Sequence, residues 1–168
     1  NELSKRCMIS GNENGYFNPK KHISRAEFAT MIQNALGLYD IESTKSFGDV
    51  NTSAWYADAV NAVVKFGLMS GYNNGNFGPQ DYLTREEAMA VLAGAMRVLG
   101  MQVTVDDDAL AKFKDAGSIS NWAKDAAKLA VSSGIIMGSN GQLKPRERIT
   151  KAEVVKIIGE LLKKNDFI

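Results

Sequence analysis

A four-residue pattern occurs three times in the sequence. In each occurrence, a cationic residue directly follows a hydroxyl residue and lies two residues before a glutamate. The three segments are Ser24-Arg25-Ala26-Glu27, Thr84-Arg85-Glu86-Glu87 and Thr150-Lys151-Ala152-Glu153. This pattern is a capping box, in which the hydroxyl and the glutamate satisfy backbone amides at the start of a helix. An arginine there would present a planar fork of donors beside exposed amides and the positive end of the helix dipole.

Arg25 and Arg85 are therefore predicted to bind an anion. The alternative is that both are solvent-exposed helix residues without a specific role. Lys151 offers only a point charge, and the sequence leaves both interpretations open at that position.

The capping boxes belong to a repeat that covers nearly the whole chain. Residues of the first copy recur 60 positions later: Gly11, Asn14, Gly15, Phe17, Pro19, Arg25 and Glu27 correspond to Gly71, Asn74, Gly75, Phe77, Pro79, Arg85 and Glu87. In a third copy, Phe47, Asp49 and Trp55 correspond to Phe113, Asp115 and Trp122. The copies span roughly residues 1–37, 47–99 and 113–164, and the first lacks the part that would hold its tryptophan. Such dense, colinear matches indicate a repeat architecture.

Each copy is predicted to consist of a helix, a glycine-rich loop and a second helix. The first helices are expected to start near Ser53 and Ser120, to place Trp55 and Trp122 on their apolar faces, and to end at left-handed glycines, Gly67 and Gly134. The loops carry an Asn-Gly turn signal. The Phe or Leu that follows this turn (Phe17, Phe77 or Leu143) is expected to plug the loop into the core.

The second helices carry apolar residues at helical spacing. They are Phe28, Met31, Ile32, Ala35 and Leu36 in copy one, Ala88, Val91, Leu92, Ala95 and Met96 in copy two, and Val154, Ile157, Ile158, Leu161 and Leu162 in copy three. One such helix cannot bury its row of apolar residues alone, but three helices packed together can. We predict an all-α fold in one unit spanning 1–168. The three second helices form a central bundle about a pseudo-threefold axis, and the first helices and loops project as three lobes.

Composition argues against several function classes. The 20 basic and 19 acidic residues leave a net charge of +1, which does not predict nucleic-acid binding. No apolar run approaches the ~20 residues needed to cross a bilayer, and no signal peptide is recognised. The lone Cys7 cannot form an internal disulfide and is expected to be a small, half-buried residue.

Catalytic and metal-binding patterns are also missing from the sequence. The single histidine, His22, lies beside two lysines and is expected to be exposed. The run Asp106-Asp107-Asp108 lacks the spacing of a calcium loop, and no Cys/His cluster suits zinc. We therefore expect no enzymatic activity, metal or cofactor in this chain.

These motifs together resemble the S-layer homology repeat. The resemblance rests on the Phe-x-Asp segment and the tryptophan after it, the loop Gly71-Tyr72-Asn73-Asn74-Gly75-Asn76-Phe77-Gly78-Pro79, and the box Thr84-Arg85-Glu86-Glu87. It covers about two and a half repeats. It implies a three-lobed unit that attaches S-layer proteins and surface enzymes non-covalently to the wall of Gram-positive bacteria. Its implied ligand is an acidic secondary cell-wall polysaccharide, often bearing ketal-linked pyruvate, and its implied location is extracellular, within a larger surface protein.

The resemblance suggests roles for the recurring residues. Pyruvate on a sugar is a carboxylate, which the forks of Arg25 and Arg85 could hold by paired hydrogen bonds. Trp55 and Trp122 could stack on a sugar ring, although each could instead anchor its helix in the core. Asp49 and Asp115 could accept sugar hydroxyls, but a structural role in a turn is favoured.

Grooves are expected where the second helix of one copy meets the first helix of the next. One groove would combine Arg25 with Asp49, Trp55 and Tyr56. Another would combine Arg85 with Asp115 and Trp122, and a third would need Lys151 and the missing front of copy one, so at most two grooves are expected to bind. Gly71 and Gly138 would either let the ligand approach the backbone or satisfy a turn. The alternative function is protein docking or self-association within a surface layer.

Overall fold

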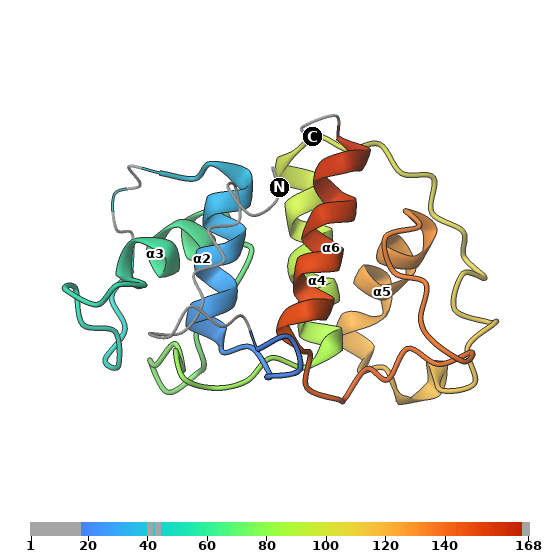
Figure 1. The fold of residues 1–168 in the computed structure, drawn as a ribbon, viewed down its shortest axis with the longest axis horizontal. Coiled ribbons are helices and arrows are strands. Elements are labelled where there is room, and N and C mark those ends of the chain that lie inside the picture. The colour runs from blue at the N-terminus through green and yellow to red at the C-terminus, as the bar shows by residue number, and fades with distance from the viewer. Residues whose placement is uncertain (1–17, 40–41, 43–44, 166–168) are drawn as a thin grey trace.

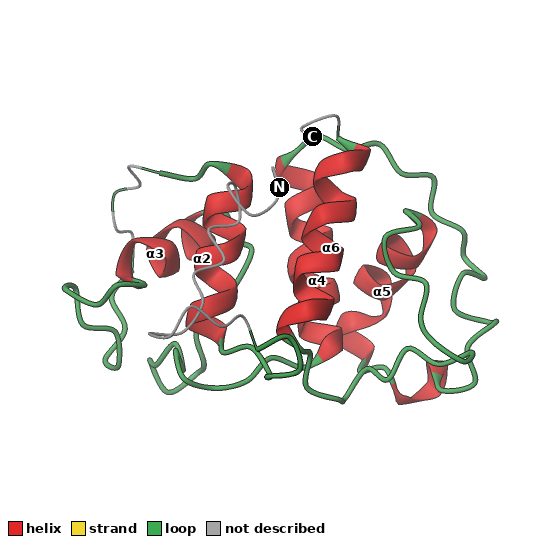
Figure 2. Cartoon of the chain, in the orientation of Figure 1, coloured by secondary structure: helices red, strands yellow, loops and turns green. Residues whose placement is uncertain are grey.

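The computed structural model describes residues 18–39, 42 and 45–165, and these form helices joined by loops (Figures 1 and 2). The five α-helices of this part are α2 (Arg25–Leu36), α3 (Ala57–Lys65), α4 (Arg85–Val98), α5 (Lys124–Ser132) and α6 (Lys151–Lys164). Two short 3-10 helices, η1 (Ala116–Ser118) and η2 (Asn121–Ala123), precede α5. The described residues contain isolated β-bridges but no strand, so the all-α prediction is confirmed.

The three second helices, α2, α4 and α6, begin where the sequence predicts. Ser24, Thr84 and Thr150 are their N-caps, and each side chain accepts a hydrogen bond from the backbone amide three residues on. Each box glutamate accepts in return from the N-cap amide, so all three capping boxes are complete. This local pattern needs no tertiary contact to fix the start of the helix.

The first helices begin later than expected. The α-helices start at Ala57 and Lys124 rather than near Ser53 and Ser120, and neither has a side-chain cap. In copy three, the 3-10 helix η2 does begin directly after Ser120 and leads into α5. The amide and hydroxyl of Ser53 donate to Asn51 Oδ1, in a turn that competes with helix formation. The two tryptophans therefore precede their helices and remain exposed, with exposed fractions of 66% for Trp55 and 61% for Trp122. The expectation that they lie on the apolar faces of the helices is wrong.

The loops confirm other local predictions. Gly67 and Gly134 adopt left-handed φ values of 65° and 73°. Phe77 and Leu143 are fully buried, as expected for side chains that plug the loops into the core. The corresponding loop of copy one, residues 11–17, and Cys7 lie outside the described residues.

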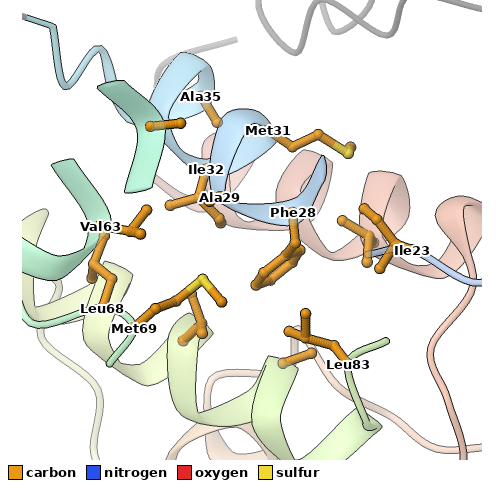
Figure 3. Close-up of a cluster of buried hydrophobic side chains, with 14 of the residues drawn as sticks. Ile23, Phe28, Ala29, Met31, Ile32, Ala35, Val63, Leu68, Met69 and Leu83 are labelled. Atoms are coloured by element: carbon orange, nitrogen blue, oxygen red, sulfur yellow. The ribbon is translucent and has the colours of Figure 1, made fainter. Parts of the chain in front are cut away.

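The core is built on the second helices. Their predicted apolar positions are all buried except Leu36 and Ile157, which are partly buried. The α3 helix packs on α2, and α5 packs on α4. The α6 helix joins the two halves, because Ile158 belongs to the cluster around α2 and Leu161 to the cluster around α4. Figure 3 shows Phe28, Met69 and Leu83 pointing into a shared space within the first cluster.

A closed set of backbone hydrogen bonds links the three copies just before their second helices. The Ile23 amide donates to the Ile149 carbonyl at 3.2 Å, the Ile149 amide to the Leu83 carbonyl at 3.0 Å, and the Leu83 amide to the Ile23 carbonyl at 3.4 Å. The starts of α2, α4 and α6 are therefore brought together, and with them the cations of the capping boxes. No helix among the described residues is long and apolar enough to cross a membrane.

Candidate functional site

Arg25 is held at the start of α2 by residues of copy two. Its Nε donates to the Phe77 carbonyl at 2.8 Å, and its Nη2 donates to the Ser70 carbonyl at 2.6 Å. Its guanidinium carbon lies 4.6 Å from the centre of the Phe77 ring and 4.9 Å from that of Tyr72. With only 6% of its surface exposed, Arg25 is not the solvated helix residue of the alternative interpretation.

The pocket at Arg25 is built by all three copies. Copy one supplies Arg25, and copy three supplies Trp122. The remaining lining residues come from copy two: Leu68, Met69, Ser70, Gly71, Tyr72, Leu83, Glu87, Ala90 and Val91. A guanidinium group, a phenol ring and an exposed indole therefore border one concave surface between copies.

Arg85 lines a second pocket, between copies two and three. Its Nε donates to the Leu143 carbonyl at 2.7 Å, as Arg25 does to Phe77. Its Nη1 forms an ion pair with the Glu153 carboxylate. Gly138, Ser139, Lys156 and hydrophobic residues complete the lining.

Lys151 is paired in a similar way. Its ammonium donates to Glu27 Oε1 at 2.7 Å, which joins copy three to copy one. Burial raises the pKa of Glu27, but the hydrogen bond from Lys151, the Ser24 amide and the positive charges of Lys151 and Lys21 outweigh it, so the pKa is lowered. Glu27 is therefore ionised at neutral pH.

Asp49 and Asp115 hold the glycine-rich loops. The two carboxylate oxygens of Asp49 accept from the amides of Phe77 and Gly78, both at 2.8 Å. Asp115 accepts from the amides of Leu143 at 2.9 Å and Lys144 at 2.7 Å. Burial raises the pKa of Asp115, but these amides, its own backbone amide and the charge of Arg85 outweigh burial and lower it. Both aspartates therefore have a structural role, but they hold a distant loop rather than the turn before the helix that was expected from the sequence.

Gly71 and Gly138 line the two pockets. Close packing also requires glycine at both positions. A Cβ on Gly71 would overlap the Phe47 ring and lie 2.8 Å from the Asn76 carbonyl oxygen. A Cβ on Gly138 would lie 2.6 Å from both the Gln142 carbonyl oxygen and the Phe113 ring. Close packing against the ring and the loop carbonyl therefore accounts for glycine at both positions, and ligand approach to the backbone stays a prediction.

The grooves combine the predicted residues differently from the expectation. Trp122 borders the Arg25 pocket, not that of Arg85. Asp49 and Tyr56 line a separate polar hollow on copy two, which shares Tyr72 with the Arg25 pocket.

Trp55 lines none of these three pockets, and its ring meets that of Tyr56 edge-on, with centroids 5.2 Å apart. The expectation that Trp122 lies with Arg85 is wrong, because that grouping depends on the order in which the copies close around one another. A repeat pattern does not encode that order. Asp115 does lie beside Arg85, as expected.

Glu86 also shapes the surroundings of the Arg25 pocket, although its role was not predicted from the sequence. Its side chain is buried at the start of α4, with 4% of the residue exposed. Its carboxylate accepts from the amide of Ser120 at 2.9 Å and from its hydroxyl at 2.8 Å, two residues before Trp122. The signal available in the sequence is that the equivalent positions hold alanine, Ala26 and Ala152.

Comparison with known proteins places this arrangement in a family. Residues 1–29, 46–89 and 112–155 match the model of the S-layer homology domain. The chain belongs to the S-layer homology family.

Several surface proteins share this S-layer homology region. The chain is 38% identical over 163 residues to the Surface-layer 125 kDa protein of Lysinibacillus sphaericus. The aligned region covers 95% of the chain and 13% of that protein. It is 34% identical over 161 residues to the S-layer protein sap of Bacillus anthracis, covering 95% of the chain and 19% of that protein.

The amylopullulanase of Thermoanaerobacterium thermosulfurigenes is 34% identical over 164 residues, covering 97% of the chain and 9% of that protein. The chain therefore spans less than a fifth of each of these relatives.

Proposed function

We propose that this S-layer homology chain anchors a larger protein to the bacterial cell surface by binding an acidic, pyruvylated wall polysaccharide. The observation that carries the proposal is the position of Arg25, whose guanidinium lines a pocket formed by all three copies. The proposed location is extracellular, at the cell wall. The association is non-covalent.

The geometry around Arg25 suits a carboxylate. The carbonyls of Phe77 and Ser70 orient the guanidinium without neutralising its charge. An arginine has five N–H donors, so further donors remain for a ligand after these two bonds. The neighbouring Phe77 and Tyr72 rings displace water, which strengthens a charge-assisted hydrogen bond in the pocket.

Trp122 supplies the second type of contact that a sugar needs. Trp122 as a residue is 61% exposed, and it borders the same pocket. Its flat apolar face can cover the C–H face of a sugar, while the indole N–H remains available as a donor. In this proposal, Arg25 binds the pyruvate carboxylate and Trp122 packs on a sugar ring.

We also propose that residues 1–168 form one three-lobed unit with pseudo-threefold symmetry. The closed hydrogen bonds among Ile23, Leu83 and Ile149 support this arrangement, because equivalent residues make equivalent bonds from one copy to another. Three of the isolated bridges follow the same cyclic pattern, pairing His22 with Thr150, Ser24 with Tyr82, and Thr84 with Arg148.

The chain is proposed to be a binding module without catalytic activity of its own. The support is that one region, with 34–38% identity, recurs within S-layer proteins and an amylopullulanase and covers 9–19% of their length. A shared region of this kind is expected to carry attachment rather than the chemistry of one of those proteins.

Replacing Arg25 by lysine tests the proposal. Copy three carries lysine at this position, so Arg25→Lys keeps a side chain that the repeat tolerates while removing the planar fork. We expect at least about tenfold weaker retention on purified wall polysaccharide, and an equal loss for unmodified protein when pyruvate is removed from the glycan. Arg97→Ala, an exposed change near the end of α4, is the control and should bind normally.

Two results would reject the sugar-binding proposal. One is unchanged retention of Arg25→Lys on polysaccharide that still carries pyruvate. The other is capture of the same surface protein from polysaccharide-free extract by both Arg25→Lys and the unmodified chain, with no binding to the glycan. That second result would instead support protein docking.

A further inference from the structure

The three equivalent cations of the capping boxes have unequal partners. Arg85 is paired with the Glu153 carboxylate, and Lys151 with the Glu27 carboxylate. The Arg25 side chain donates instead to two backbone carbonyls. Among the described residues, no carboxylate lies within 4.0 Å of the Arg25 side-chain nitrogens.

The difference lies in one oxygen of each box glutamate. In all three boxes, Oε2 accepts from the N-cap amide. The other oxygen, Oε1, binds Arg85 in Glu153 and Lys151 in Glu27. Glu87 lines the Arg25 pocket but makes no such ion pair with Arg25. The same glutamate therefore caps its helix in every copy but neutralises the neighbouring cation in only two.

Glu153 carries a full negative charge at neutral pH. Burial raises its pKa, but the Thr150 amide and hydroxyl, together with the charge and hydrogen bond of Arg85, outweigh burial and lower it. Lys156 also lines this pocket, but it is exposed, so water and salt screen its charge. A ligand carboxylate approaching Arg85 must therefore compete with a carboxylate already bound to Nη1.

We propose that Glu153 acts as an internal substitute for the ligand carboxylate at Arg85, so that the Arg25 pocket is the one site of these two that binds the acidic sugar strongly. The inference rests on the proposed function and assigns it to one pocket. Glu153 is a specificity-determining residue here: it blocks a second pocket that otherwise has the same arginine, the same carbonyl contact and an equivalent glycine.

Glu153→Gln separates the two roles of the glutamate. Glutamine also completes a capping box, so the start of α6 should be preserved while the competing charge is removed. The matched control is Glu160→Gln, the same change on α6 at a residue that lines none of the pockets described. Thermal unfolding of both variants should confirm that α6 remains folded.

Calorimetric titration would measure the number of sites. The probe is a methyl hexoside that carries a 4,6-ketal of pyruvate, so its one charge is the carboxylate. We expect about one strong site in the unmodified chain and about two in Glu153→Gln, with the Arg85 site of the unmodified chain at least about tenfold weaker. Adding Arg85→Ala to Glu153→Gln should return the count to about one, and the control Glu160→Gln should bind as the unmodified chain does.

The outcomes separate this inference from the proposed function. Two equal sites in the unmodified chain, or no second site in Glu153→Gln, would overturn the inference and leave glycan anchoring intact. Loss of the strong site in Arg85→Ala but not in Arg25→Lys would also overturn it. Failure of every variant to bind the probe would overturn both proposals.

Discussion

The Lys151 ammonium lies 2.7 Å from the Glu27 carboxylate, a hydrogen-bonded ion pair between residues 124 positions apart in the chain. The contact joins the start of α6 to the start of α2, next to the backbone bond between Ile23 and Ile149. It therefore helps to hold the third copy against the first.

Because of this ion pair, the free energy of unfolding should depend on pH in the acid range. The folded pKa of Glu27 is lowered from about 4.5, so ionised Glu27 stabilises the fold above that value, and the contribution is lost as pH falls through the folded pKa. Glu153 and Asp115 have lowered pKa values as well and act in the same direction. We expect Glu27→Gln to cost about 1 kcal/mol at pH 7 and less at pH 3.

Urea unfolding followed by circular dichroism at the two pH values would measure this effect. The control is Glu160→Gln, which removes an exposed pair with Lys163 and should change stability little at either pH. An equal cost of Glu27→Gln at pH 3 and pH 7 would show that the ionised pair does not stabilise the fold.

Glu86 should position Trp122. Replacing Glu86 by alanine leaves the Ser120 amide and hydroxyl without their acceptor, and we expect a loss of about 1–3 kcal/mol in the free energy of unfolding. Alanine itself suits the helix, because Ala26 and Ala152 occupy the equivalent positions.

Fluorescence would report the position of Trp122 directly. In a Trp55→Phe background, Trp122 is the remaining tryptophan, and its emission anisotropy should fall in Glu86→Ala at a temperature where the protein stays folded. Unchanged anisotropy would mean that Glu86 stabilises α4 without controlling Trp122.

The two tryptophans should differ in function although they match in the repeat. Trp122→Ala is expected to weaken glycan binding about fivefold to tenfold, because its ring borders the Arg25 pocket. Trp55→Ala should leave binding nearly unchanged, since Trp55 lines none of the three pockets described. Both rings are more than 60% exposed, so neither change should cost much stability. Parallel titrations of the two variants are the measurement, and an equal loss in both would contradict the assignment.

Gly71 should not tolerate a side chain. Gly71→Ala places a Cβ against the Phe47 ring and the Asn76 carbonyl, and overpacking of this kind costs about 1–3 kcal/mol. Gly117→Ala is the control, because its Cβ would meet no atom within 4 Å. Thermal melts of the two variants should separate clearly. Similar melting temperatures would show that the loop moves to accept the methyl group.

Sequence reasoning succeeded where structure is set locally. The starts of α2, α4 and α6 were predicted to the residue, because a capping box acts within four neighbouring residues. The same reasoning placed the first helices too early. The turn at Asn51 holds the chain out of a helix near Ser53. After Ser120 the chain first forms the 3-10 helix η2, and the α-helix follows it.

The composition of the pockets could not be derived in that way. Trp122 reaches Arg25 only because the copies close in one particular order, which depends on packing between distant segments. The boxes around Arg25 and Arg85 also share the N-cap hydroxyl, the arginine and the glutamate, so these motif residues alone do not predict that Arg85 is paired and Arg25 is not.

The closed circuit of amide bonds through Ile23, Leu83 and Ile149 has a consequence for how such modules evolve. An open solenoid lengthens when its gene gains another repeat, because each end offers a free stacking surface. Here each copy already donates to one partner and accepts from the other, so an added fourth copy would find no vacant place. Stronger attachment must therefore come from better pockets or from a second complete set of three, not from a gradual increase in repeat number.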